Sequence, residues 1–296
     1  MLEFRDIAIT DKERITAALN TSQFMGCEYS FSNNMAWKRL GDSQISFYKD
    51  FYICCSFRSD DGVPRFFLPS GSGDYRDVIN EMMKYSEILG KPLRIAGITD
   101  TSLNMLSELF PDRFYTETDD GDWDYIYLSD DLITLRGRKY HSKRNHLARF
   151  NELGADYSFM TERDFDDCIT FSTLEYNSRS AETDHSFVAE QYAINTYFNY
   201  FGELGLQGGV IRIDGNVAAF TIGDRLNNDT FCVHIEKADT RFNGIYAGIN
   251  NCFAGSAASG YKYINREEDL GIEGLRKAKQ SYHPAFLLKK YTVTFK

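Results

Sequence analysis

The sequence predicts a mixed α/β protein made of two related domains. Segments with apolar residues at alternate positions are followed by segments of helical periodicity, which indicates strands and helices in turn. Aromatic residues make up 15% of the 296 positions, which favours a large core rich in strands. The order hairpin strands, loop, helix, strand, helix, strand occurs in residues 44–128 and again in 206–295, without residue-level repetition. We therefore expect one domain at 1–131 and a second at 132–296.

In the first half, short strands alternate with helices. We expect helices at Asp11–Leu19, Ser30–Trp37 (or a turn there), Asp74–Leu89 and Thr101–Phe110, and strands at Gln44–Lys49, Phe51–Phe57, Arg65–Leu68, Leu93–Ile98, Arg113–Glu117 and Tyr125–Leu128. The helix Asp74–Leu89 is predicted because Val78, Met82 and Tyr85 recur on one face. Pro111 ends the helix that precedes it.

In the second half, helices precede a block of strands. We expect helices at Gly137–Leu153, Glu162–Tyr176, Ser186–Leu204, Ile245–Gly260 and Ile272–Tyr282, and strands at Leu206–Ile213, Asn216–Asp224, Thr230–Glu236, Tyr261–Asn265 and Phe286–Phe295. Asp214-Gly215 is a strong two-residue hairpin signal. The strands at 230–236 and 261–265 flank a helix, so we expect them to lie parallel, with the helix crossing over between them.

Composition and charge narrow the class of protein. Residues 1–131 carry 13 Lys and Arg against 23 Asp and Glu, whereas residues 132–296 carry 20 of each. An acidic first half does not suit a nucleic-acid surface, so we predict no DNA partner and place any polyanion on the second half. No apolar run is long enough to cross a membrane, and the first residues do not form a signal peptide. The six cysteines show no CxxC pair, so we expect reduced core thiols in a cytoplasmic protein.

Several strings carry a resemblance to a known family. They are Leu135–Leu147, Val233–Tyr246, Ile264–Leu275 and Arg276–Tyr282. With them, nearly the whole chain resembles the family named for the C-terminal domain of phosphatidylglycerol lysyltransferase, specifically its soluble members of unknown function. The resemblance implies two tandem GNAT-type N-acyltransferase domains, a fold shared with acyl-CoA transferases and aminoacyl-tRNA transferases. Larger relatives pass an aminoacyl group from charged tRNA to a lipid. They do so with a membrane domain that these residues do not contain, so the lipid acceptor does not carry over.

Residues 241–246 resemble the acyltransferase loop Arg/Gln-x-x-Gly-x-Gly/Ala, whose amides bind the diphosphate of the cofactor. Arg241 and Gly244 match, with Asn243 between them, whereas Tyr246 stands where the loop has a small residue. The resemblance implies that Arg241, Asn243 and Gly244 bind the phosphate of a donor at a helix N-terminus. The alternative is a helix-entry turn that needs glycine for its backbone shape. Both interpretations stay open.

His234 and Glu236 end the strand before this loop. Residues two apart on a strand share a face, so we expect Cys232, His234 and Glu236 to point the same way. At this strand end Glu236 is a candidate catalytic base for an attacking amine, and His234 a candidate substrate-binding residue. The alternative is a hydrogen-bonded structural pair.

Four charged residues, Arg266, Glu267, Glu268 and Asp269, follow the neighbouring parallel strand. Ligands of open α/β sheets bind outside the carboxyl ends of the strands. We therefore regard Arg266, Glu267 and Asp269 as candidates for binding a substrate with ammonium and carboxylate groups. Glu268 is a candidate catalytic residue. A solvated run of charges is the alternative.

Lys279 and Tyr282 close the next helix. In acyltransferases a Tyr on this helix often protonates the leaving thiolate, and in tRNA-using relatives a Lys can neutralise charge. The resemblance therefore implies catalytic roles for Tyr282 and Lys279. Either role needs an unusual environment, because both side chains ordinarily titrate near about pH 10. The alternative for Tyr282 is a place in the core.

The predicted helical stretch Arg136–Arg149 concentrates basic residues. They are Arg136, Arg138, Lys139, Lys143, Arg144 and Arg149, together with His141 and His146. Such a helix can grip RNA or lipid phosphates, or it can dock on the acidic first half and neutralise it. The polar stretch 177–185 is a candidate cover for the site.

Two functions follow from these residues. The first is an acyl- or aminoacyl-transferase in which an amine or hydroxyl attacks an activated carboxyl group, with aminoacyl-tRNA or acyl-CoA as co-substrate. The two strands would part beside Glu236 and expose the carbonyl to backbone donors. The second is a binding module that has kept the fold and lost the chemistry. The spacings HxxEH, HExxH and CxxC are absent, so we predict no metal site. Donor, acceptor and oligomeric state stay open.

Overall fold

The computed structural model describes residues 1–179 and 185–296 and divides into two compact units. Unit 1 comprises 1–124, 268–271 and 288–296, and unit 2 comprises 125–267 and 272–287. Near its C-terminal end the chain therefore returns to unit 1 twice. These units are defined by contacts between Cα atoms, and the domain limits 1–131 and 132–296 stay a prediction.

Unit 1 is built on a mixed sheet. The described strands have the order β1-β2-β3-β4-β6-β15-β7, and β5 pairs with β3. Their bounds are β1 (Arg5–Asp6), β2 (Ser43–Tyr48), β3 (Phe51–Ser56), β4 (Arg65–Phe67), β5 (Ser70–Gly71), β6 (Arg94–Ile98), β7 (Phe114–Glu117) and β15 (Tyr291–Phe295). Its helices are α1 (Lys12–Ser22), α2 (Phe31–Gly41), α3 (Tyr75–Ile88) and α4 (Asp100–Leu109). Only β4 and β6 pair in parallel among the described strands of this sheet.

Helix α3 shows how local sequence sets these elements. Asp74 caps its N-terminus by accepting hydrogen bonds from the backbone N–H groups of Arg76 and Asp77. Val78 and Met82 are fully buried, as their helical spacing predicts. The chain leaves the helix at Gly90, whose φ of +64° is easily adopted only without a side chain.

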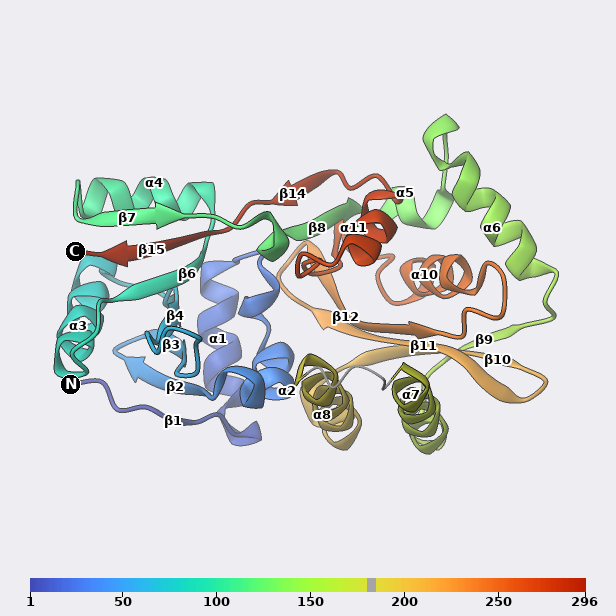
Figure 1. The fold of residues 1–296 in the computed structure, drawn as a ribbon, viewed down its shortest axis with the longest axis horizontal. Helices are drawn as coiled ribbons and strands as arrows, with labels where there is room; N and C mark the ends of the chain where they lie inside the picture. Colours follow the sequence, from blue (N-terminus) through green and yellow to red (C-terminus); the bar gives the residue numbers. More distant parts are fainter. Residues whose placement is uncertain (180–184) are drawn as a thin grey trace. The chain divides into compact units, whose positions relative to one another are not determined.

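Unit 2 is built on a second mixed sheet of order β14-β8-β13-β12-β11-β10-β9. Its strands are β8 (Asp124–Leu128), β9 (Asp156–Phe159), β10 (Gln207–Ile213), β11 (Asn216–Arg225), β12 (Thr230–Ala238), β13 (Tyr263–Asn265) and β14 (Phe286–Leu288). Its helices are α5 (Ser129–Thr134), α6 (His141–Asn151), α7 (Phe165–Arg179), α8 (His185–Asn199), α9 (Phe201–Leu204), α10 (Ile245–Ser256) and α11 (Glu273–Gln280). Helix α10 covers one face of β11 and β12, and α7 and α8 lie on the other (Figure 1).

The predicted strand–helix–strand unit is confirmed, since β12 and β13 are parallel and α10 connects them. The predicted last strand, Phe286–Phe295, was wrong in one respect. It forms two strands, β14 and β15, which belong to different sheets. The chain breaks at Lys289-Lys290, where the Lys290 amine is buried between the carboxylates of Asp124 and Glu28, both 2.7 Å away.

Two further differences concern the second half. Strand β9 was missed because its residues are largely exposed and lack an apolar pattern. The basic helix begins at His141, after a short 3-10 turn, because Gly137 has a φ of +91°.

Residues 180–184 of the predicted polar stretch 177–185 lie outside the described residues. In the ranges that the structure describes, no helix combines the length and apolar character that a bilayer crossing requires.

Candidate functional site

Strands β12 and β13 pair over only three residues. Thr230 lies opposite Tyr263, and Cys232 lies opposite Asn265, where β13 ends. Strand β12 continues to Ala238, so its second half has no strand beside it on that edge in the described part of the chain. The pairing ends because β13 stops at Asn265, and the predicted parting of the two strands beside Glu236 stays a prediction. Side chains, rather than a backbone ladder, fill the place where the pairing stops.

A β-bulge in β12 determines which side chains lie where the pairing with β13 stops. On β11, Ile222 lies opposite Ile235 and the next residue, Gly223, lies opposite Val233, so His234 is an extra residue without a partner. A bulge interrupts the alternation of side chains along a strand. The expectation that His234 and Glu236 share a face was wrong for this reason.

Contacts with helices confirm the two directions. Asn250, on α10, donates a hydrogen bond to Glu236. On the opposite face, the ring of Tyr197, on α8, stacks on His234 with a centroid distance of 5.5 Å. The extra residue in β12 therefore directs His234 and Glu236 to opposite faces of the sheet, where they belong to two separate polar clusters.

The first cluster surrounds Glu236. Arg266 donates from Nη2 to Glu236 Oε1 at 2.8 Å, and Asn250 Nδ2 donates to Oε2 at 3.2 Å. The side chains of Arg266 and Glu236 are each only 11% exposed. The Arg266 guanidinium also lies 4.9 Å from the ring centroid of Tyr282 and 5.6 Å from that of Tyr127. Nη1 of Arg266 and Oδ1 of Asn250 are buried and have no hydrogen-bond partner among the described residues.

Tyr282 and Lys143 complete this cluster. The Lys143 ammonium lies 3.6 Å from the ring centroid of Tyr282. The pKa of Lys143 falls to about 8, because burial and the Arg266 charge lower it and Glu236 only partly offsets them. Burial raises the pKa of Tyr282 well above its ordinary value, so its hydroxyl stays protonated. No hydrogen bond of that hydroxyl is present within the described ranges. A protonated phenol beside two cationic side chains can give a proton to a leaving group.

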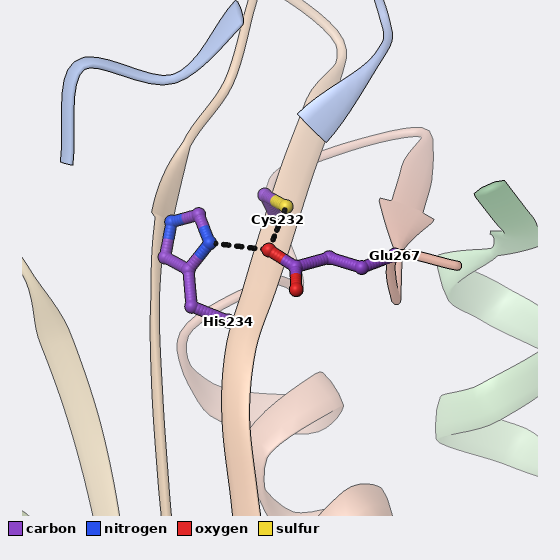
Figure 2. A group of neighbouring side chains, drawn as sticks. All are labelled: Cys232, His234 and Glu267. Atoms are coloured by element: carbon purple, nitrogen blue, oxygen red, sulfur yellow. Dashed lines mark hydrogen bonds and ion pairs between the residues drawn. The ribbon is translucent and has the colours of Figure 1, made fainter. Parts of the chain in front are cut away.

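The second cluster surrounds His234, whose side chain is fully buried. Figure 2 shows His234 with Cys232 and Glu267. Its Nε2 lies 3.0 Å from Asp224 Oδ1, and its Nδ1 lies 2.8 Å from Glu267 Oε1. The Cys232 thiol approaches the same Glu267 oxygen at 3.8 Å (Figure 2). Burial lowers the pKa of His234, but the surrounding groups, Asp224 among them, raise it well above its ordinary value. The raised pKa favours the protonated imidazole, which lies between the two carboxylates with one ring nitrogen facing each.

This second cluster also has the donor atoms of a metal site. The ligand atoms of Cys232, His234 and Glu267 lie within 4.8 Å of one another. In the arrangement described, however, each ring nitrogen already faces a carboxylate oxygen. The hydrogen-bonded pair that the sequence offered as the alternative for His234 thus takes the form of a bridge between Asp224 and Glu267.

The remaining charged candidates make other contacts. Glu268 Oε2 accepts from the Cys27 thiol at 3.2 Å, within unit 1. Asp269 is buried and accepts from the backbone N–H of Gly271. Lys279 donates to the carbonyl oxygens of Arg266 at 2.6 Å and Glu267 at 3.1 Å, which fixes the chain after β13. Any catalytic role of these residues stays a prediction.

The loop before α10 is arranged around a close helix contact. Arg241 is 86% exposed and pairs with its neighbour Asp239, and Asn243 is exposed. Gly244 has a φ of +90°, and a Cβ there would collide with the carbonyl oxygen of His146 on α6. Helix packing thus accounts for the glycine, and phosphate binding by the loop stays a prediction.

Sequence reasoning missed four residues of the two clusters. Asn250 had a signal, as one of two adjacent amides, Asn250 and Asn251, within an otherwise mostly small and apolar helix. Lys143 was noticed only as one of many basic residues on its helix. Asp224 and Tyr197 gave no local sign of their role, because their contacts with His234 depend on the tertiary fold.

Comparison with known families and structures places this geometry in context. Residues 19–294 match the family described as phosphatidylglycerol lysyltransferase, C-terminal. A conserved protein of unknown function from Bacteroides thetaiotaomicron is 36% identical in sequence, with a TM-score of 0.95 and complete coverage of both chains.

Two more distant structures share the fold. L-PGS from Bacillus licheniformis is 16% identical with a TM-score of 0.70, over 96% of this chain and 92% of that one. A tandem GNAT protein from the clavulanic acid biosynthesis pathway is 9% identical with a TM-score of 0.50, over 99% and 98%. The two mixed sheets therefore represent a tandem GNAT fold.

Proposed function

Because this chain belongs to the phosphatidylglycerol lysyltransferase C-terminal family, we propose that its unit 2 transfers an acyl or aminoacyl group from an activated donor to an amine or hydroxyl acceptor. Family and fold together indicate a GNAT-like acyl- or aminoacyl-transferase. The reacting centre of our proposal is the cluster of Glu236, Arg266 and Tyr282. Aminoacyl-tRNA and acyl-CoA are the two candidate donors.

One observation carries the proposal. Where β12 and β13 stop pairing, the sheet edge is occupied by a buried ion pair, Arg266–Glu236, beside the unpartnered hydroxyl of Tyr282. Buried ion pairs contribute little net stability, so keeping one here favours a functional role. Beyond Cys232, those backbone N–H groups of β12 that point away from β11 have no strand beside them in the described part of the chain, so they are suited to polarise a carbonyl oxygen.

The chemistry assigns a task to each residue. The acceptor nitrogen or oxygen attacks the carbonyl carbon of the donor, and the bond from that carbon to the leaving oxygen or sulfur breaks. The Tyr282 hydroxyl gives its proton to the leaving atom. Glu236 accepts the proton that the acceptor loses, and this proton then restores the Tyr282 hydroxyl. No oxidant or metal is required, and one proton moves in total from the acceptor to the leaving group.

The contacts of Glu268 and Lys279 argue against the catalytic roles that the sequence suggested for them. Glu268 binds Cys27 in unit 1, so our proposal gives the proton-accepting role to Glu236 alone. Lys279 is engaged by backbone carbonyl groups and serves to hold the Arg266 backbone in place.

Binding and transfer assays test this function. Thermal stability is measured with acetyl-CoA, with aminoacyl-tRNA and with uncharged tRNA, and transfer of a labelled group to a panel of amines is followed in parallel. Stabilisation by one donor and label transfer that is lost in Tyr282→Phe support the proposal. No stabilisation by any donor, together with no transfer, rejects it.

The alternative function is a binding module without chemistry. Two observations favour it. The glycine of the loop is explained by packing against α6, and Arg241 is held by Asp239 instead of being directed at a ligand. If Arg241→Ala leaves donor binding and stability unchanged and no transfer is detected, the module is the better description.

A further inference from the structure

The cluster at Tyr282 contains one more positive charge than negative charge. Lys143 and Arg266 both lie against the ring of Tyr282, with distances of 3.6 and 4.9 Å to its centroid. Glu236 is the one carboxylate that pairs with either of them in the described structure, and it pairs with Arg266. Lys143 has no ion-pair partner there, although four residues earlier Lys139 on the same basic segment pairs with Asp131 at 3.3 Å.

Two buried atoms in the same cluster lack partners. Nη1 of Arg266 is a donor, and Oδ1 of Asn250 is an acceptor, and both belong to side chains bound to Glu236. A buried donor that lacks an acceptor costs free energy, and more so when it is charged. Such atoms are therefore a sign of a missing ligand group when they lie together.

We propose that Lys143 and Arg266 form a subsite for an anionic group of the ligand, a carboxylate or a phosphate, with Asn250 accepting a hydrogen bond from a hydroxyl or amino group beside it. The inference rests on the proposed function in taking this ligand to be a substrate. The anion accepts from Arg266 Nη1 and lies next to the Lys143 ammonium. Its negative charge balances the cluster, and Glu236 remains paired with Arg266.

The environment of Lys143 agrees with this assignment. Partial burial and the Arg266 charge both lower its pKa, and Glu236 does not fully compensate. A bound anion would favour the charged amine and raise that pKa. Anion binding should therefore weaken as the pH rises above about 8, where the free protein loses this charge.

Calorimetric titration with inorganic phosphate, acetate and serine tests the subsite without any need for catalysis. Glycerol serves as the uncharged control. We expect at least one anion to bind the wild-type protein, with an affinity that falls about tenfold between about pH 7 and about pH 9.5. Lys143→Met should weaken it about tenfold at the lower pH. Lys139→Met, on the same segment, should change it less than about twofold.

The arms of this experiment separate the possible outcomes. Binding of phosphate but not of the carboxylates identifies the group as phosphate, and the reverse identifies it as a carboxylate. Equal affinity of the wild type and a folded Lys143→Met variant overturns the inference, as does an absence of binding by phosphate, acetate and serine alike. Group-transfer assays on the same preparations keep the two proposals distinct. Anion binding that depends on Lys143, in a protein without transfer activity, upholds the subsite and rejects the enzyme.

Discussion

Arg266 donates to Glu236 across 2.8 Å where β12 and β13 stop pairing. The ion pair takes the place of a backbone ladder at the centre of the candidate site. Both side chains are largely buried, so removing one partner leaves an uncompensated charge in the protein. This relationship leads to the first prediction.

Glu236→Leu should lower the free energy of unfolding by about 3–5 kcal/mol, because Arg266 then loses its partner. The double variant Glu236→Leu/Arg266→Met should recover much of that loss. Urea unfolding measures both values. As a control, Glu273→Leu breaks the exposed Lys277–Glu273 pair on α11 and should cost less than about 1 kcal/mol. Equal costs for the two single variants would contradict the prediction.

His234 should make stability fall as the pH rises. Its pKa is raised in the folded protein, so the folded state keeps a proton that the unfolded state releases above about pH 6.5. The stabilisation is thus complete below about 6.5 and is lost as the pH rises through the folded-state value. His234→Gln should remove this slope. Urea midpoints of both proteins across that range give the comparison, and parallel curves would show that the imidazole is neutral.

Lys143 should show the opposite dependence. Its pKa of about 8 lies below the ordinary value, so above this pH the unfolded chain holds the proton more firmly than the folded protein. Stability should therefore rise between about pH 8 and about pH 10.4 through this residue. Lysine dimethylation with carbon-13 and NMR titration give the pKa directly. Lys139, measured in the same sample, serves as the reference, and identical titration of the two amines would refute the prediction.

Tyr282→Phe should separate chemistry from stability. The hydroxyl has no partner in the described structure, so its loss should change the free energy of unfolding by less than about 0.5 kcal/mol. If the proposed function holds, kcat should fall about 100-fold or more. Tyr127→Phe is the matched variant, since that buried hydroxyl donates to the Lys279 carbonyl at 2.7 Å and should cost about 1–2 kcal/mol. A Tyr282→Phe enzyme of full activity would exclude the phenol as the proton donor.

Gly244→Ala should destabilise the protein by about 1–3 kcal/mol, because alanine disfavours the positive φ of this position. The collision with the His146 carbonyl oxygen should add to this cost. Gly255, near the end of α10, is exposed and has open space where a Cβ would lie. Gly255→Ala should therefore stabilise the helix by about 0.5–1 kcal/mol. Thermal unfolding of the two variants checks the difference in sign.

The sequence predicted the fold largely because its signals are local. The order of strand, turn, helix and strand through β12, α10 and β13 follows from periodicity and glycine positions, and so does the parallel pairing. The site was less accessible. Counting alternate residues cannot detect the extra residue at His234, so Glu236 was placed on the wrong face.

Other parts of the site depend on contacts between distant positions. Lys143 reaches Tyr282 from a helix far earlier in the chain, and no short-range pattern encodes that contact. The burial of Lys290, which divides the last predicted strand, likewise depends on Asp124 and Glu28.

Gly244 and Gly248 have a consequence beyond their own turns. A side chain at Gly244 would strike the His146 carbonyl, and one at Gly248 would strike the ring of Phe150, so these two glycines set how near α6 comes to α10. Lys143 lies on α6, so its position depends on the distance between α6 and α10. A single methyl group at either glycine would draw the amine away from Tyr282 without altering any residue of the cluster. Substitutions at these two glycines would thus change the position of the Lys143 amine, and with it the proposed chemistry, without contacting the site.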